Sequence, residues 1–342
     1  MGIRLRMIHG DMAVEMEGDS AQDVLDVLHG TLARREWPQG NSRTLETTRH
    51  TLLDAMHRYI CDRTRGRTSE MYAEAIVATS VHVDPATVYL DEITLSWVGS
   101  LDSLMSERGL ASSTRSIHLR NIRTAISYAM RLGWLSSHPF DGYRMPRHLS
   151  RHRALPVEAI RAMVGLELAG VYAYHRDMFL IAFGLIGISC VDLYNLAPIT
   201  TDRRVEYSRA KTKRPYSIRV EPEITELIER HKGVGRAVDL SQRYANNRTA
   251  NVRANCALKV IGSMLYTDRD GIMRPICDEL STYWARHSWA TIAASIDIPK
   301  DTIAAALGHG ARTVTDIYID FDSRKIDEAN RRVIDYVWHQ RR

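Results

Sequence analysis

Apolar residues recur along most of the chain at the spacing of an amphipathic helix. Between residues 44 and 140 they fall three and four positions apart, as in the stripe of Leu52, Met56 and Tyr59, with polar residues between them. No alternation typical of a strand interrupts this stretch. The pattern therefore predicts a body of helices that each bury one face.

A second body with helical spacing begins after Pro156, a residue that suits the first turn of a helix. Within it, two extended segments at 205–211 and 215–220 flank the polar turn Thr212-Lys213-Arg214, which predicts a β-hairpin. The other helices predicted here cover residues 178–191, 222–231, 247–265, 280–295, 300–307 and 323–338. The expected fold class is mainly α with a small β-hairpin.

A basic segment separates the two bodies. Pro139 and Pro146 break the helical pattern, and Arg147 and Arg151 lie in the charged stretch that follows. We therefore expect an N-terminal extension over residues 1–41, a helical domain over 42–145, a basic linker over 146–154 and a second domain over 155–342.

The N-terminal extension shows neither the continuous helical spacing of the two bodies nor the alternation of a strand. It is expected to be irregular, with a short segment at 3–7, a turn at 9–11 and a helix at 20–35. Its expected role is contact with additional sites or partners.

The charge of the chain suits an acidic polymer as partner. Lys and Arg number 46 against 41 Asp and Glu, which gives a formal charge of +5 and a pI near 9.0. Many basic proteins never touch nucleic acid, so charge alone leaves DNA or RNA binding open.

The cysteines and the hydropathy of the chain argue against a disulfide-rich secreted protein and against a membrane protein. The four cysteines are far apart and include no CxxC pair, so we expect reduced thiols in a cytoplasmic protein, with neither a disulfide framework nor a zinc site. The longest apolar run, residues 178–191, is shorter than the roughly 20 residues of a membrane span. No export or anchoring signal is evident, so no membrane association is expected.

The last helix of the first body carries cationic side chains opposite its apolar face. These are Arg115, His118, Arg120 and Arg123. Two interpretations stay open: a solvated face, or a helix that contacts DNA phosphates together with Arg147 and Arg151.

Three segments of the second body resemble the tyrosine recombinase, or phage integrase, family. Thr282–Thr291 looks like its His-x-x-Arg-His box, Leu307-Gly308-His309 with Tyr318 nine residues on looks like its Leu-Gly-His…Tyr box, and Arg209-Ala210-Lys211-Thr212 looks like its hairpin lysine. The helical block at 44–140 resembles the core DNA-binding domain of the family. The resemblance implies two domains that form a C-shaped clamp around duplex DNA.

The resemblance also implies a role for each matching residue. A tyrosine phenol must attack a phosphodiester whose nonbridging oxygens gain negative charge. The planar fork of Arg286 matches two phosphate oxygens. His309 donates a hydrogen bond and helps to deprotonate Tyr318, Lys211 protonates the departing 5′ oxygen, and Tyr318 forms a 3′-phosphotyrosine bond. No cofactor, metal or ATP is expected.

The sequence departs from the family at its first catalytic arginine, where Ser189 stands. This change resembles a subgroup of integrases from Bacteroidetes mobile elements. Loss of one preorganised donor can cost about 3 kcal/mol. Strand alternation would place Tyr207, Arg209 and Lys211 on one face, so Arg209 is the expected substitute cation.

A second departure is Tyr283, which replaces the box histidine three residues before Arg286. A neutral phenol can donate one hydrogen bond to phosphate but cannot act as an imidazolium. Any acid-base role of that histidine then falls on His309 or His287.

The expected function is site-specific DNA recombination, of the integrase, transposase or invertase type. The partners implied are double-stranded DNA and three further copies of the chain in a tetramer on synapsed sites. An accessory DNA-bending protein is left open, and the helix at 323–338 is expected to dock either on its own core or into a neighbouring protomer. The alternatives are a catalytically impaired DNA-binding regulatory or architectural protein derived from a recombinase, and a topoisomerase-like enzyme.

Overall fold

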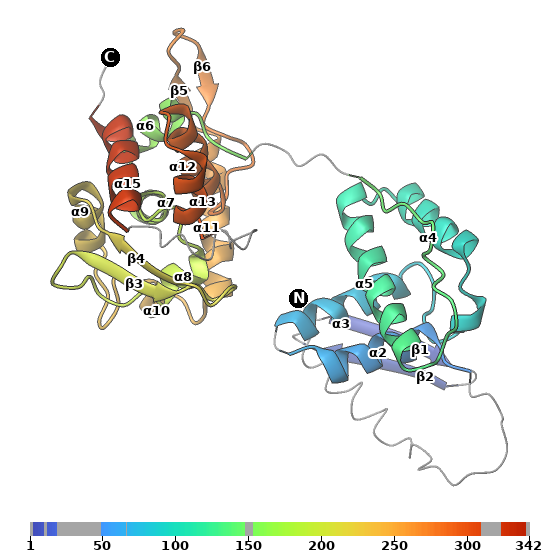
Figure 1. Cartoon of the computed structure of the whole chain (residues 1–342). Coiled ribbons are helices and arrows are strands. Elements are labelled where there is room, and N and C mark those ends of the chain that lie inside the picture. The colour runs from blue at the N-terminus through green and yellow to red at the C-terminus, as the bar shows by residue number, and fades with distance from the viewer. Residues whose placement is uncertain are drawn as a thin grey trace. The chain divides into compact units, whose positions relative to one another are not determined.

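The chain divides into two compact units, Met1–Ser150 and Arg151–Arg342 (Figure 1). The structure is a computed structural model, and it describes residues 3–9, 12–18, 49–65, 67–147, 153–308 and 323–339. The division falls inside the predicted linker. Helices dominate both units and the strands form small antiparallel sheets, as the sequence predicts.

The first unit opens with a β-hairpin that the sequence interpretation missed. Strands β1 (Ile3–His9) and β2 (Met12–Gly18) pair antiparallel, with Ile3 opposite Gly18 and His9 opposite Met12. The prediction of an irregular start is therefore wrong for these residues, and the predicted helix at 20–35 lies outside the described residues. The remaining elements are α2 (Leu52–Arg63), α3 (Arg67–Ser80), the 3-10 turn η1 (Leu90–Glu92), α4 (Leu95–Glu107) and α5 (Ser112–Arg131).

Helix α5 organises the core of the first unit. It contacts α2, α3 and α4, and it buries Leu119, Ile122 and Ile126 almost completely. Helix α2 begins at a capping box in which Thr51 and Asp54 satisfy each other's backbone N–H groups. The predicted helical body is thus confirmed over its described residues.

The second unit is built around α7 (Gly170–Gly184), which is buried along most of its length and contacts α9, α11 and α12. The other elements are α6 (Val157–Gly165), α8 (Cys190–Tyr194), β3 (Arg204–Ser208), β4 (Pro215–Arg219), α9 (Pro222–Arg230), α10 (Leu240–Arg243), α11 (Asn247–Gly262), β5 (Leu265–Thr267), β6 (Met273–Pro275), α12 (Trp284–Ser295), α13 (Lys300–Ala306) and α15 (Ser323–Trp338). Strands β3 and β4 form the predicted hairpin, whereas the β5–β6 hairpin was not predicted.

The predicted helix at 178–191 is wrong at its C-terminal end. Helix α7 stops at Gly184, Ile186 and Gly187 take left-handed φ values of 57° and 69°, and α8 begins at Cys190. The apolar run continues through this turn because the turn is buried, and burial alone does not distinguish a helix from a turn.

The predicted start of helix 280–295 is also too early. The Thr282 N–H donates to Asn255 Oδ1 at 2.9 Å and its hydroxyl donates to Asn251 Oδ1 at 2.8 Å, so the chain is held by α11 until α12 begins at Trp284.

Helix α15 packs on its own domain in this single chain. Its Asn330 accepts a hydrogen bond from Trp289 Nε1 at 2.9 Å and donates to the Gly184 carbonyl at 2.9 Å. Ionic contacts add to this attachment, since Arg204 pairs with Asp327 at 2.7 Å. Docking into a neighbouring protomer stays a prediction.

All four cysteines are free thiols. No described helix combines the length and the apolar character that crossing a bilayer requires.

Candidate active site

Arg286 lies at the meeting point of three elements of the second unit. Helix α12 carries it, and only 8% of the residue is exposed. Its Nη1 lies 3.5 Å from the Gly187 carbonyl after α7, and its Nη2 donates to the Leu307 carbonyl at the end of α13. The guanidinium is therefore held by backbone oxygens from two separate turns.

Gly187 allows this close approach. A Cβ at this position would lie 2.3 Å from the Cα of Arg286, and the φ of 69° is one that other residues adopt only with strain. The turn after α7 can therefore reach Arg286 only with glycine at position 187.

A second glycine lets the end of α13 meet the β3–β4 hairpin. Gly308 has a φ of 61°, and a Cβ on it would lie 1.8 Å from the hydroxyl oxygen of Tyr216. The Tyr216 hydroxyl donates to the Leu307 carbonyl at 2.8 Å. Leu307 therefore accepts from both Arg286 and Tyr216.

The hairpin presents two stacked tyrosines to this site. Tyr207 and Tyr216 are directly opposite in the β3–β4 register, with ring centroids 5.1 Å apart and ring planes within 10°. Burial raises the pKa of Tyr207 well above its ordinary value, as do Tyr216 and Asp192, while Arg286 and Arg209 act in the opposite direction. Tyr207 therefore stays protonated at neutral pH with both guanidinium groups nearby.

Lys211 and Arg209 lie in the hairpin turn, so the prediction of a strand reaching residue 211 is wrong. Strand β3 ends at Ser208, the Arg209 N–H donates to the Arg214 carbonyl at 2.9 Å, and the Lys213 N–H donates to the Arg209 carbonyl at 2.8 Å. The argument from strand alternation therefore fails for Lys211, although Arg209 does lie close to Tyr207. Lys211 is exposed and Arg209 is half-buried.

Ser189 serves as a helix cap where the family has its arginine. Its hydroxyl donates to Asp192 Oδ2 at 2.6 Å at the start of α8. The other oxygen of Asp192 accepts from the Ala210 N–H in the hairpin turn at 2.8 Å. Sequence reasoning missed the roles of Asp192 and Tyr216, because both depend on contacts with residues distant in the chain.

Tyr283 differs from Arg286 in its environment, although the two were expected on one helix face. Tyr283 is 49% exposed, precedes the first residue of α12, and makes an edge contact with the His287 ring at 4.8 Å. Arg286 is buried. His309 and Tyr318 lie outside the described residues, as does Arg151.

The predicted cations of α5 differ in their availability to a ligand. Arg115 Nε lies 3.2 Å from Asp102 Oδ1, so this guanidinium is paired within the first unit. Burial lowers the pKa of His118, with a further contribution from His82. Arg120, Arg123 and, beyond the helix, Arg147 are exposed.

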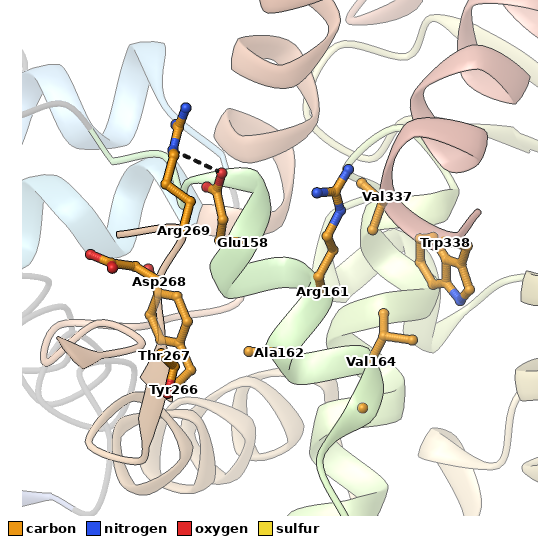
Figure 2. Close-up of a pocket in the computed structure, with 11 residues that line it drawn as sticks. Glu158, Arg161, Ala162, Val164, Tyr266, Thr267, Asp268, Arg269, Val337 and Trp338 are labelled. Carbon is orange, nitrogen blue, oxygen red and sulfur yellow. Dashed lines mark ion pairs between the residues drawn. The ribbon is translucent and has the colours of Figure 1, made fainter. Parts of the chain in front are cut away.

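One hollow of the second unit is separate from these residues. It has a volume of about 700 Å³ and lies between α6, the β5–β6 hairpin and the end of α15 (Figure 2). Arg161, Trp338 and the ion pair of Glu158 with Arg269, at 3.4 Å, line it. None of the predicted catalytic residues takes part in it.

One group of side chains in the described ranges has the spacing of a metal site. Ligand atoms of Glu223, Asp335 and His339 lie within 4.8 Å of one another. Arg331 donates to both carboxylates, at 2.8 Å each. Burial opposes ionisation of Glu223, but the hydrogen bonds from Arg331 and His339 outweigh it and lower the pKa to about 2. The positive charge of Arg331 therefore already balances these two carboxylates, as a metal ion would.

Comparisons with known proteins agree with this architecture. Residues 51–145 match the sequence profile of the phage integrase SAM-like domain. The chain is similar to a lambda integrase from a tetramer bound to a Holliday junction, with a TM-score of 0.60, 14% identity and coverage of 92% of each chain. A search of curated proteins finds no match.

A second solved structure with this fold is the Tn1549 transposon integrase in complex with transposon right end DNA. The TM-score is 0.63 at 15% identity, over 82% of this chain and 98% of that chain. At these identities the likeness defines the fold, which is the one found in tyrosine recombinase structures.

Proposed function

We propose that the protein is a tyrosine site-specific recombinase that cleaves and rejoins DNA through Tyr318. The observation that carries this proposal is that Arg286 is buried and contacts backbone carbonyls in place of a carboxylate. Arg176, buried to a similar degree, is neutralised by Asp177 at 2.7 Å, whereas Arg286 forms no ion pair within the described part of the chain and contacts neutral carbonyls. A buried cation without a carboxylate keeps its charge for an anionic ligand.

A phosphodiester satisfies the chemistry of this site. The Tyr318 oxygen attacks phosphorus as its proton passes to His309, and the bond from phosphorus to the 5′ oxygen breaks. Lys211 supplies the proton that the departing 5′ oxygen takes up. Arg286 stabilises the charge on the nonbridging oxygens, and Tyr283 donates a hydrogen bond to them. Rejoining reverses these steps and needs no external energy, because the phosphotyrosine bond preserves the energy of the broken one.

Arg209 is the proposed replacement for the arginine missing at Ser189. Its half-buried guanidinium lies close enough to Tyr207 to favour the ionised phenol, as does that of Arg286. The Arg209→Ala variant should lose DNA cleavage and keep its DNA affinity within about twofold, because one donor in a preorganised site contributes about 3 kcal/mol to the transition state. Cleavage at the wild-type rate would remove Arg209 from the mechanism.

The proposed partner is double-stranded DNA, bound by the helical domain of residues 51–145 and by the second unit. The named relatives are an integrase tetramer on a Holliday junction and an integrase on transposon DNA. We also propose that four copies assemble on synapsed sites and that the protein belongs to the Bacteroidetes subgroup. Participation of an accessory DNA-bending protein is a further proposal.

A second candidate is a DNA-binding protein that has lost catalysis. Ser189 favours it, because its hydroxyl is committed to Asp192 and offers phosphate no cation. The two candidates differ in whether a covalent bond to DNA forms.

A suicide DNA substrate distinguishes them. When the strand is nicked just 3′ of the cleavage position, the short fragment that carries the released 5′ hydroxyl diffuses away and the covalent adduct accumulates. We expect a DNA-linked protein band from the wild-type chain and none from Tyr318→Phe, with equal DNA binding by both. Binding without any adduct from the wild-type chain would favour the catalytically inactive protein.

A further inference from the structure

One side-chain hydrogen bond joins the β3–β4 hairpin to the end of α13. Tyr216 on β4 donates its hydroxyl proton to the Leu307 carbonyl at 2.8 Å, and the same carbonyl accepts from Arg286. The oxygen of Leu307 is thus shared between the hairpin and the guanidinium that is proposed to bind phosphate.

The ring of Tyr216 is held from two sides. Tyr207 stacks on one face with the ring planes within 10°, and the missing side chain of Gly308 leaves room for the hydroxyl. The ring stack and the space at Gly308 thus place the hydroxyl at the Leu307 carbonyl.

The turn end of the hairpin needs such attachments because β3 and β4 form a sheet of two strands, and the ion pair of Arg204 with Asp327 holds only the opposite end. An isolated two-stranded hairpin is marginally stable in water. On the side of the turn, the Ala210 N–H donates to Asp192 at 2.8 Å. Tyr216 supplies the corresponding contact toward α13, two residues after the end of the turn that bears Lys211.

We propose that Tyr216 is a positioning residue for strand cleavage: it fixes the hairpin, and with it Lys211, relative to Arg286. This proposal rests on the proposed function, since the purpose of the arrangement is to hold a proton donor beside the departing 5′ oxygen. Without the hydroxyl, the hairpin keeps its strands and its tyrosine stack but loses its link to Leu307. Proton delivery by Lys211 then slows.

The test compares Tyr216→Phe with Tyr194→Phe. The Tyr194 hydroxyl also donates to a backbone carbonyl of the second unit, that of Tyr244, at 2.8 Å, and Tyr194 is likewise half-buried. Single-turnover cleavage is measured on preformed protein–DNA complexes with two substrates, one with the natural 5′ bridging oxygen and one with sulfur in its place. A departing thiolate is stable without a proton, so the sulfur substrate does not depend on Lys211.

We expect Tyr216→Phe to slow cleavage of the oxygen substrate at least tenfold and that of the sulfur substrate less than threefold. Tyr194→Phe should leave both rates within about twofold. The melting temperature and DNA affinity of each variant are measured first, and rates are taken well below the melting temperature on the bound fraction. Damage to the fold slows both substrates alike, so the ratio of the two rates reports positioning.

An equal slowing of both substrates, or no slowing of either, overturns the role of Tyr216. Absence of an adduct from the wild-type chain with both substrates instead overturns the proposed function itself.

Discussion

Buried polar residues of the second unit differ in whether all their polar atoms have hydrogen-bond or ion-pair partners. Asp177 is met by Arg176 at 2.7 Å and by His231 at 2.8 Å. His175 is fully buried, and its Nε2 lies 2.9 Å from the Tyr244 hydroxyl, while its Nδ1 has no hydrogen-bond partner among the described residues. Burial, with a contribution from Arg243, lowers the pKa of His175 to about 4.

His175 should make the second unit sensitive to mild acid. The unfolded chain takes up a proton on this histidine below about pH 6.5, whereas the folded chain does so only near pH 4, so the free energy of unfolding falls as the pH drops through this window. The full effect is roughly 3 kcal/mol, at about 1.4 kcal/mol for each pKa unit. Urea denaturation at pH 7.5, 6.0 and 4.5 measures it.

His175→Gln is the matched variant, because the amide can still bond to the Tyr244 hydroxyl but does not titrate. It should lose less stability than the wild type between pH 7.5 and 4.5. Equal losses in both proteins would show that other groups cause the pH dependence. Ionised carboxylates such as Glu223, with a pKa of about 2, contribute mainly below about pH 4.5, where the unfolded carboxyl is more than half protonated.

At the scale of elements, α15 closes the core of the second unit. It contacts α6, α12, α13 and β4. Its buried apolar residues include Val333 and Ile334, which are both fully buried, and Asn330 links it to Trp289. A helix with this much buried surface is part of the domain in the single chain, so its removal affects stability as well as any assembly.

Replacement of Ile334 tests this packing. Ile334→Ala should lower the free energy of unfolding by about 2–4 kcal/mol, because the removed methyl groups leave a cavity in a core that relaxes only partly. Glu328→Ala, at an exposed position of the same helix, is the control and should change it by less than about 0.5 kcal/mol.

The denaturation midpoint of the wild-type chain without DNA should also be independent of protein concentration. A midpoint that rises with concentration would show that association with another copy stabilises the chain, and it would contradict a single chain that α15 closes by itself.

At the scale of the whole molecule, both units carry cations that could contact the proposed DNA partner. The first unit has exposed Arg120 and Arg123 on α5, whereas Arg115 is already paired with Asp102. The second unit has the Arg286 site and the hairpin turn. A duplex bound by both units would therefore meet phosphate contacts from each, and those of the first unit are the simpler to isolate.

The double variant Arg120→Ala, Arg123→Ala should weaken DNA binding to all sequences by a similar factor. Each lost phosphate contact releases about one fewer counterion, so the slope of log K against log salt should become shallower by roughly two. Fluorescence anisotropy at several salt concentrations measures the slope. Arg58→Ala, in which the lost arginine already pairs with Asp62 at 2.7 Å, is the control. An unchanged slope would show that Arg120 and Arg123 on α5 contact solvent and not DNA phosphates.

Local sequence patterns predicted much of the fold. The spacing of apolar residues predicted two helical bodies, prolines and basic residues predicted the linker region, and two extended segments around a polar turn predicted the β3–β4 hairpin. Helical periodicity is a local signal, and so is a proline in the first turn of a helix, such as Pro222 of α9, which explains why α9 and α15 were predicted within one residue of their bounds. The same signal failed between Gly184 and Cys190, because a buried turn is as apolar as a buried helix.

The residue types of the candidate site could also be read from the sequence, since Arg286, Lys211 and the Leu307–His309 segment match a family pattern. Only the tertiary structure decided how they are held: Arg286 on two carbonyls, Ser189 as a cap on Asp192, and Tyr216 on the oxygen that Arg286 also uses. These contacts join residues up to 99 positions apart. Hydrogen bonds over such separations follow from the packing of whole elements, and no local pattern of residues encodes them.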